Sequence, residues 1–440
     1  MVKTRLVYVC SHCGAETPKW QGKCFNCGRF GTLEQKEVKV VAKAALGQKA
    51  KSSTASRLLS EIKLAAAQRI SSGFLEIDRV LGGGLVPGSV ILLAGSPGLG
   101  KSTLLLQLCS QIRSSLPALY ISAEESVSQV KLRARRLAVK EDKILVLAEN
   151  DVDVIASTIE SLASKVSVVI VDSIQAVSIS GIESFSGSIT QVRESGHRLS
   201  AVCKELSLPV VFVGHVTKSG AIAGPKSLEH LVDVVLFMEG SEQSRIRILR
   251  SLKNRFGDVF EVGFFRLESN GFCEIENPSE RMIEGRKEQV PGSVVAVVLD
   301  GARPLVLEVQ ALTAPNVYGN PLRNVTGISH KRLLMLLAVL QRRAGLNFSR
   351  HNVFVNVSGG IRVFEPGIDL AVCVALGSSL KNQVVDEKLA AFGEVGLLGE
   401  IRAVSQQEQR VKTARKLGFN KILSSKEVIN IKQALKFAGL

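Results

Sequence analysis

The sequence lacks three features that would each place the chain in a different class of protein. No uninterrupted apolar run among its 440 residues reaches the roughly 18 residues that a membrane-spanning helix needs. Residues 1–5 do not lead into the apolar core of a secretory signal peptide, so we expect a cytoplasmic protein with no membrane partner. Eight cysteines in a chain of this length and compartment do not indicate a disulfide framework.

Acidic residues are also few relative to basic ones. Lys and Arg number 56 against 40 Asp and Glu, which gives a net charge of +16. Residues 1–60 contribute eleven positive and three negative side chains to this excess. Such a segment is either a solvated tail or a surface that attracts polyanions such as nucleic acid. Because 45% of the residues are hydrophobic and 22% charged, we exclude wholesale disorder and expect two or three folded domains.

Four of the cysteines form two CxxC pairs separated by ten residues near the amino terminus. Two such knuckles supply a closed tetrahedral shell of thiolates, which predicts a structural Zn²⁺ site with no open coordination position. Two unrelated pairs of free thiols are the alternative. The predicted ligands are Cys10, Cys13, Cys24 and Cys27. The remaining cysteines have apolar neighbours and are predicted to be buried: Cys109, Cys203, Cys273 and Cys373.

The strongest motif is a phosphate-binding loop at 95–102, which matches G-x-x-x-x-G-K-[ST] in full. It follows an apolar run at 89–94 that reads as a buried strand, and a helical pattern opens at 103. We expect Lys101 to reach the β- and γ-phosphates of ATP and Ser102 to ligate Mg²⁺. The predicted nucleotide-binding residues are Gly95, Ser96, Pro97, Gly98, Leu99, Gly100, Lys101, Ser102 and Thr103.

Two further strands end in acidic residues. The run 167–171 leads into Asp172, which we expect to hold Mg²⁺ through water. The run 118–122 leads into a pair of glutamates, of which we favour Glu124 over Glu125 as the group that polarises the attacking water. A merely solvated strand end is the alternative for this pair.

Downstream of a fourth strand at 209–213, residues 214–225 read as a mobile loop at the ligand-binding edge of the sheet. Further on, the segment 253–257 places Lys253 and Arg255 in a turn between two strand-like runs. These cations fit ordinary turn chemistry, contact with the nucleotide of a neighbouring subunit, or contact with a DNA backbone.

The zinc knuckle, GSPGLGKST at 95–103, GHVTKSGAIAGPKSLEH at 214–230 and KNRFG at 253–257 together resemble the RadA (Sms) family of bacterial DNA repair proteins. The resemblance covers nearly the whole chain. It implies a DNA-dependent, RecA-like ATPase that forms a homo-hexameric ring and binds single-stranded and branched DNA. It further implies branch migration in homologous recombination beside a recombinase of the RecA type.

The same resemblance implies roles for single residues. Glu124 matches the catalytic glutamate of the family, and His215 matches the position that senses the γ-phosphate. Lys253 and Arg255 match residues tied to nucleotide and DNA handling at subunit interfaces. The implied cofactors are ATP, Mg²⁺ and Zn²⁺.

The segments 353–371 and 393–401 resemble the Lon protease domain. Aligned on these segments, Gly367 stands where the nucleophilic Ser of that domain would be, and Glu408 stands where its Lys general base would be. Since neither residue can perform that chemistry, we predict a catalytically inactive, ring-forming scaffold. Its basic residues either face DNA or form a solvated helix face: Lys331, Arg332, Arg342, Arg343 and Arg350.

We therefore predict an α/β chain with a RecA-like P-loop core. The predicted domains are a zinc-binding knuckle at 1–33, a basic linker at 34–60, an ATPase domain at 61–275 and an inactive Lon-protease-like domain at 276–440. The competing functions are an ATP-dependent protease, which Gly367 and Glu408 disfavour, and a RecA-like kinase or clock-type ATPase that acts without DNA.

Overall fold

The computed structural model describes residues 4–11, 16–17, 19–24, 28–39, 69–215, 226–240, 244–259, 261–286, 290–317 and 319–440. The chain divides into two compact units, residues 1–66 and 67–440. Among the described residues, no helix is both long and apolar enough to cross a membrane.

The first unit holds a small antiparallel sheet in the order β2-β1-β3. Its strands are β1 (Thr4–Cys10), β2 (Glu16–Thr17) and β3 (Leu33–Lys39). Strand β3 pairs with β1 along its whole length, so residues 34–39 belong to this sheet rather than to the predicted linker. The charged sequence of β3 conceals the strand because backbone pairing, not apolar alternation, defines it. The rest of that linker, 40–60, lies outside the described residues.

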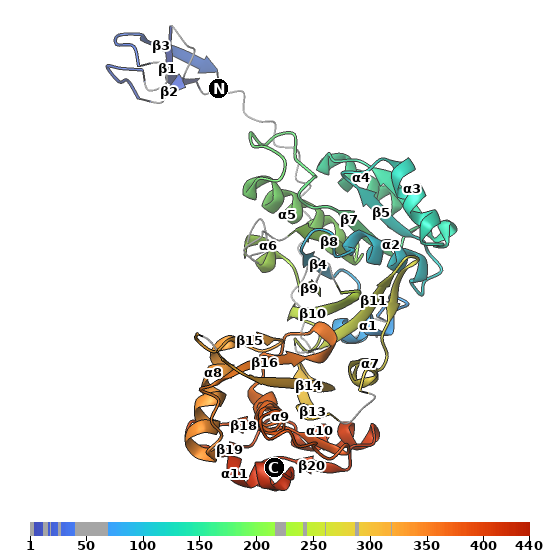
Figure 1. The fold of residues 1–440 in the computed structure, drawn as a ribbon. Coiled ribbons are helices and arrows are strands. Elements are labelled where there is room, and N and C mark those ends of the chain that lie inside the picture. Colours follow the sequence, from blue (N-terminus) through green and yellow to red (C-terminus); the bar gives the residue numbers. More distant parts are fainter. Residues whose placement is uncertain are drawn as a thin grey trace, which may run out of the picture. The chain divides into compact units, whose positions relative to one another are not determined.

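The second unit begins with a nine-stranded sheet in the order β12-β11-β10-β9-β4-β8-β7-β5-β6 (Figure 1). The six strands from β9 to β6 are mutually parallel, and β10 to β12 continue the sheet antiparallel. The strands are β4 (Val90–Gly95), β5 (Ala118–Ser122), β6 (Ile144–Ala148), β7 (Val168–Asp172), β8 (Val210–His215), β9 (Val234–Gly240), β10 (Ile246–Asn254), β11 (Val262–Glu268) and β12 (Gly271–Glu274).

Helices cover both faces of this sheet, as a buried parallel sheet requires. Side chains of β4 alternate: Ile91 and Leu93 join one apolar cluster, whereas Val90 and Leu92 join the other. The first cluster includes residues of α1 (Leu75–Leu81), α2 (Lys101–Gln111) and α3 (Val127–Arg136). The second includes residues of α4 (Val152–Leu162), α5 (Ile189–Glu205) and α6 (Lys226–Leu231).

The C-terminal part of the chain, coloured yellow to red in Figure 1, builds a second sheet in the order β15-β16-β14-β13-β17-β20. Its elements are α7 (Pro278–Ile283), β13 (Ser293–Asp300), β14 (Arg303–Pro315), β15 (Arg323–Thr326), α8 (His330–Val339), β16 (His351–Val357), α9 (Asp369–Lys381), β17 (Leu389–Ala391), β18 (Glu394–Val395), β19 (Ile401–Arg402), α10 (Gln407–Lys416), β20 (Lys421–Leu423) and α11 (Ile431–Phe437). The apolar helix α9 packs against this sheet and supplies much of the domain's core.

The predicted boundary at 275–276 lies in the connection between the two sheets, after β12 and before β13. Glu76 on α1 is buried and pairs with Arg303 on β14 at 2.7 Å. At the other end of the same hairpin tip, Asp300 accepts a hydrogen bond from Nη2 of Arg250 at 2.9 Å. These two ion pairs join the sheets through the tip of the β13–β14 hairpin.

The cysteines outside the zinc knuckle are packed as predicted, with one exception. Cys109, Cys203 and Cys373 are fully buried in the apolar clusters. Cys273 is only half-buried, and its thiol lies 3.7 Å from a carboxylate oxygen of Glu268. It lies on the edge strand β12, which has a neighbour on one side only.

Candidate nucleotide-binding site

The predicted phosphate-binding loop connects the end of β4 to the start of α2. Strand β4 ends at Gly95 and helix α2 begins at Lys101. Gly100, the residue before the helix, has φ +95°, and a Cβ there would lie 2.9 Å from the Phe272 ring. Only glycine fits this position, which fixes how the loop enters the helix. Residues 96–98, at the crest of the loop, are exposed.

Lys101 is almost fully buried, with 4% of its surface exposed. Its Nζ donates hydrogen bonds to the carbonyl oxygens of Gly95, at 2.8 Å, and of Ser96, at 3.1 Å. Burial lowers the pKa of Lys101 to about 8, although the negative charges of Asp172 and Glu124 act to raise it. Both predicted carboxylates are therefore close enough to Lys101 to influence its ionisation.

The parallel strands bring the predicted residues to one edge of the sheet. Gly95 on β4 stands opposite His215 on β8, and Ser122 on β5 stands opposite Asp172 on β7. Strands β7 and β8 are neighbours, so all four residues lie at the carboxyl ends of adjacent strands. This edge is where open α/β sheets bind ligands. The predicted loop continues from His215 into 216–225, which lie outside the described residues.

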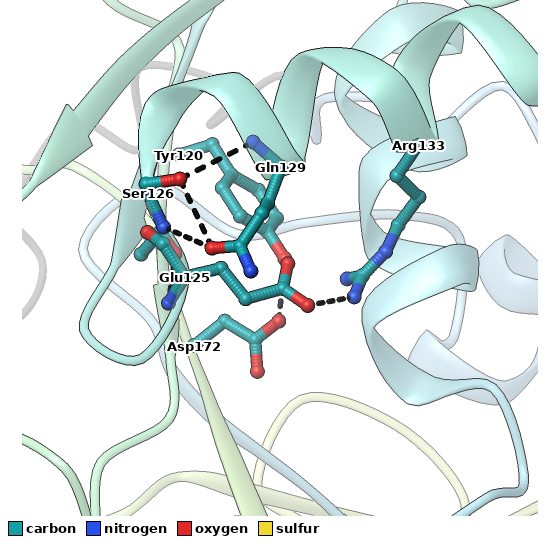
Figure 2. A network of polar contacts seen from close by, with 7 residues as sticks. Tyr120, Glu125, Ser126, Gln129, Arg133 and Asp172 are labelled. Atoms are coloured by element: carbon teal, nitrogen blue, oxygen red, sulfur yellow. Dashed lines mark hydrogen bonds and ion pairs between the residues drawn. The ribbon is translucent and has the colours of Figure 1, made fainter.

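Asp172 is half-buried and carries a hydrogen bond that the sequence did not indicate. The Tyr120 hydroxyl donates to Oδ2 of Asp172 at 2.5 Å (Figure 2). The available signal was positional: Tyr120 precedes Ser122 by two residues, so both side chains project from the same face of β5. Using it would have required the register between β5 and β7, which the sequence does not state.

The two neighbouring glutamates have different surroundings. Glu124 is exposed and accepts a hydrogen bond from the Ser173 hydroxyl at 2.5 Å. Glu125 is half-buried and forms an ion pair with Arg133, as Figure 2 shows. Ser126 then caps α3, because its hydroxyl accepts the Gln129 N–H at 3.4 Å. The structure thus directs Glu124 to the strand edge and Glu125 to helix α3.

Lys253 and Arg255 do not join this group. Strand β10 runs antiparallel to β9, and its Asn254 stands opposite Val234, near the amino-terminal end of β4. The six residues of β4 separate that end from the phosphate-binding loop by about 17 Å. The KNRFG segment and the loop of the same chain therefore lie at opposite edges of the sheet.

At that opposite edge the two cations are held side by side. The Lys253 Nζ donates to the carbonyl oxygens of Glu229, at 2.6 Å, and Val232, at 2.7 Å. Arg255 pairs with the buried carboxylate of Asp233 at 3.1 Å. Burial and the positive charge of Arg255 lower the pKa of Lys253.

Two of the four predicted zinc ligands lie in the described part of the amino-terminal unit. Cys10 and Cys24 are buried, with 2% and 1% exposed, and pack in one small cluster. The Gly28 N–H donates to the carbonyl oxygen of Cys24 at 3.0 Å. One cysteine from each pair thus lies in the same small cluster, as a tetrathiolate site requires. Cys13 and Cys27 lie outside the described residues.

In the C-terminal domain the predicted protease position is filled. A Cβ on Gly367 would lie 2.5 Å from Oε1 of Glu365. That carboxylate forms an ion pair with the fully buried Arg410 and accepts the Leu299 N–H at 2.8 Å. Glu408, at the predicted general-base position, is exposed on α10.

Four of the five basic residues predicted to form a surface on the C-terminal domain are exposed, and the fifth is paired with a buried carboxylate. Lys331, Arg342, Arg343 and Arg350 are exposed. Arg332 instead donates through Nε to Oδ1 of Asp369 at 2.8 Å, and Asp369 is fully buried. A buried carboxylate requires a cation, so Arg332 serves the fold rather than a free basic surface.

Comparison with known families matches three segments of the chain. Residues 8–35 match the family model of a rubredoxin metal binding domain, and residues 55–221 match that of an AAA domain. Residues 314–428 match the family model of subunit ChlI of Mg-chelatase. The first segment contains all four paired cysteines, and the second contains the phosphate-binding loop.

Curated relatives align over almost the whole chain. DNA repair protein RadA of Bacillus subtilis is 43% identical over 427 residues, covering 96% of this chain and 93% of the relative. DNA repair protein RadA of Pseudomonas aeruginosa is 43% identical over 428 residues, with the same coverage of both chains. DNA repair protein RadA of a Synechocystis species is 42% identical over 464 residues, covering 99% of this chain and 92% of the relative.

Proposed function

The chain belongs to the family of bacterial DNA repair protein RadA, and from this premise we propose a DNA-dependent ATPase motor that acts on single-stranded and branched DNA. Its work in the cytoplasm is branch migration of recombination intermediates, beside a recombinase of the RecA type. The observation that supports the ATPase most directly is the convergence of Lys101, Asp172 and Glu124 at the carboxyl edge of the parallel sheet.

We assign roles at this edge from charge and position. Residues 95–103 cradle the phosphates of ATP, with Lys101 as the cation that meets the transferred group. Ser102 and Asp172 would hold Mg²⁺, which supplies charge neutralisation on the phosphate oxygens when it is bound. Glu124 polarises the attacking water, because its carboxylate faces this edge while Glu125 is paired with Arg133.

Lys253 and Arg255 act on the nucleotide of a neighbouring subunit. Since they lie at the edge of the sheet opposite their own phosphate-binding loop, they cannot reach the ATP held there. In a ring of identical chains, which we take to be a hexamer, this edge of one subunit faces the ATP of the next. A cation delivered in this way contributes about 10³–10⁵ in rate in other P-loop enzymes.

We further propose that the C-terminal domain, residues 276–440, is a ring scaffold without protease activity. Gly367 offers no nucleophile, and the Glu365 carboxylate fills the space beside it. The amino-terminal knuckle would hold one Zn²⁺ through Cys10, Cys13, Cys24 and Cys27. We retain 61–275 as the ATPase domain and place the linker between Lys39 and residue 61.

ATP hydrolysis measured with and without single-stranded DNA tests the central proposal. We expect turnover to rise with DNA and to disappear in Lys101→Ala, and we expect no degradation of casein. Hydrolysis that DNA leaves unchanged would favour the DNA-independent ATPase, and casein cleavage would favour the protease.

Mixing two inactive variants tests action between subunits. Chains with Arg255→Ala and chains with Lys101→Ala are each expected to be nearly inactive, whereas mixed rings regain turnover where intact Arg255 meets intact Lys101. Loss of Arg255 leaves Asp233 paired with Lys204 at 3.1 Å, so the variant should fold. Lys204→Ala, which removes the other cation from Asp233, is the matched control and should hydrolyse ATP normally. Absence of rescue in confirmed mixed rings would rule out the proposed action of Arg255 on the ATP of a neighbouring subunit.

A further inference from the structure

A buried tyrosine lies beside the carboxylate of Asp172. Tyr120 is on β5 with 1% of its surface exposed, and its ring packs in the same apolar cluster as residues of helix α2. On the neighbouring strand β7, Ile170 stands opposite Tyr120 and Asp172 stands opposite Ser122. Because residues two apart project from the same face of a strand, Tyr120 and Asp172 share one face of the sheet.

Within the described part of the chain, the hydroxyl of Tyr120 forms one hydrogen bond. It donates to Oδ2 of Asp172 at 2.5 Å, and Figure 2 shows the phenol oxygen directed at that carboxylate. The described residues donate no hydrogen bond to Oδ1 of Asp172. One oxygen of the carboxylate is therefore fixed by the protein, and the other remains available at the edge of the sheet.

The direction of this hydrogen bond follows from the chemistry of the two groups. An ionised carboxylate can only accept hydrogen bonds, so the phenol hydroxyl of Tyr120 is the donor and Oδ2 of Asp172 is the acceptor.

We propose that Tyr120 is a positioning residue for Mg²⁺, acting through Asp172. Its hydroxyl holds Oδ2 of Asp172, so Oδ1 would be the oxygen presented to a bound Mg²⁺. The tyrosine ring is locked by the apolar core around it, so the carboxylate is oriented before the nucleotide arrives. This inference rests on the proposed role of Asp172 in the ATPase site.

The competing explanation is that the hydrogen bond only satisfies a buried hydroxyl. In that case its loss would lower the stability of the domain and leave metal binding unchanged. The two explanations differ in one measurable quantity, the gain in affinity for ATPγS that Mg²⁺ provides. This gain is the ratio of the dissociation constants without and with Mg²⁺, and it needs no turnover.

Tyr120→Phe tests the proposal in the full-length chain because it removes one oxygen and keeps the ring. We expect the Mg²⁺-dependent gain in ATPγS affinity to fall about tenfold, because the variant loses a hydrogen bond to a charged group. We also expect the dissociation constant without Mg²⁺ to stay within about twofold of the unaltered protein. The Mg²⁺ concentration that half-saturates hydrolysis should rise by a similar tenfold factor.

Ile170→Val is the matched control, because it removes a methylene from the same core opposite Tyr120 on the adjacent strand. It should lower thermal stability without changing the Mg²⁺-dependent gain. Tyr120→Phe with an unaltered gain, or with a loss no larger than that of Ile170→Val, would overturn the proposal. Asp172→Asn separates the two levels of the argument. If Asp172→Asn keeps the full Mg²⁺-dependent gain, the proposed magnesium site at Asp172 is ruled out. If Asp172→Asn loses the gain and Tyr120→Phe keeps it, only the proposed role of Tyr120 is ruled out.

Discussion

Two buried cations, one in each α/β domain of this chain, have different surroundings. In the ATPase domain, Lys101 is buried against neutral carbonyl oxygens, and its pKa falls to about 8 despite two nearby carboxylates. In the C-terminal domain, Glu365 and Arg410 neutralise each other beside Gly367. Lys101, to which we assign a ligand, has a pKa that burial lowers, whereas Arg410, to which we assign none, lies in an ion pair with a carboxylate.

The largest effect is expected from breaking the Glu365–Arg410 ion pair. Arg410→Met should lower the free energy of unfolding of the C-terminal domain by about 3–5 kcal/mol, because it leaves the Glu365 carboxylate without its buried partner. Urea-dependent hydrogen exchange of peptides from α9 and α10 would measure this loss. Arg402→Met, which removes an exposed partner of Glu400, is the matched control and should cost less than about 1 kcal/mol. Equal effects of the two substitutions would contradict the distinction between the pairs.

The next largest effect is expected from replacing Lys101. Lys101→Ala should lower the rate of ATP hydrolysis by at least about 10²–10³-fold, because it removes the cation that we assign to the transferred phosphate. Steady-state hydrolysis at saturating ATP measures the loss. Lys412→Ala, on the exposed face of α10, should leave the rate unchanged. Near-normal turnover by Lys101→Ala would mean that the nucleotide is held elsewhere.

A smaller effect is expected from placing a serine hydroxyl at position 367, beside the Glu365 carboxylate. Gly367→Ser should yield no casein cleavage and should destabilise the domain by about 1–3 kcal/mol, because the new Cβ would lie 2.5 Å from Oε1 of Glu365. Adding Glu408→Lys should not create activity, since the carboxylate still fills the site. Gly285→Ser enters open space and serves as the control for stability. Detectable casein cleavage by either Gly367 variant would falsify the description of a filled site.

The sequence predicted the local parts of both sites and missed their long-range partners. The phosphate-binding loop could be predicted because strand, glycine turn and helix are contiguous, and the strand ending in Asp172 is a continuous apolar run. Likewise, the predicted absence of a nucleophile came from a local alignment that puts Gly367 at the position of the nucleophilic Ser. The Glu365–Arg410 ion pair joins residues that are 45 positions apart, and the Tyr120–Asp172 hydrogen bond joins residues that are 52 positions apart. The periodicity of a helix or a strand does not relate residues at such separations.

Strand direction was the other piece of information that the sequence withheld. A turn between two strand-like runs was expected around Lys253, but its edge of the sheet depends on the antiparallel return of β10. The predicted linker failed at residues 34–39 for a related reason, because β3 is defined by pairing with β1. In both cases the missing information is which strands, far apart in the sequence, pair through their backbones. The side-chain patterns of these two segments did not indicate that pairing.

The smallest expected effect is a pH dependence that follows from the state of Lys101. Burial lowers the pKa of Lys101 to about 8 in the nucleotide-free protein, so the amine is increasingly neutral above that pH. The phosphates of ATP favour the charged form and raise this pKa again on binding. Binding above pH 8 therefore takes up a proton, and the affinity for ATP should fall by up to about tenfold per pH unit.

Calorimetry of ATPγS binding at pH 8.5, in two buffers of different ionisation enthalpy, measures that proton directly. We expect a fractional proton uptake that declines towards pH 7, where Lys101 is already charged before binding. Lys101→Arg keeps its charge at every accessible pH and should bind without proton uptake at pH 8.5.

The stability of the folded protein should change with pH in the opposite direction to the affinity for ATP. Between pH 8 and the ordinary lysine value of 10.5 the unfolded chain binds the extra proton, so the nucleotide-free protein gains stability as pH rises. A binding enthalpy at pH 8.5 that does not depend on the buffer would show that Lys101 is already protonated in the free site, and the contrast with Arg410 would then rest on geometry alone.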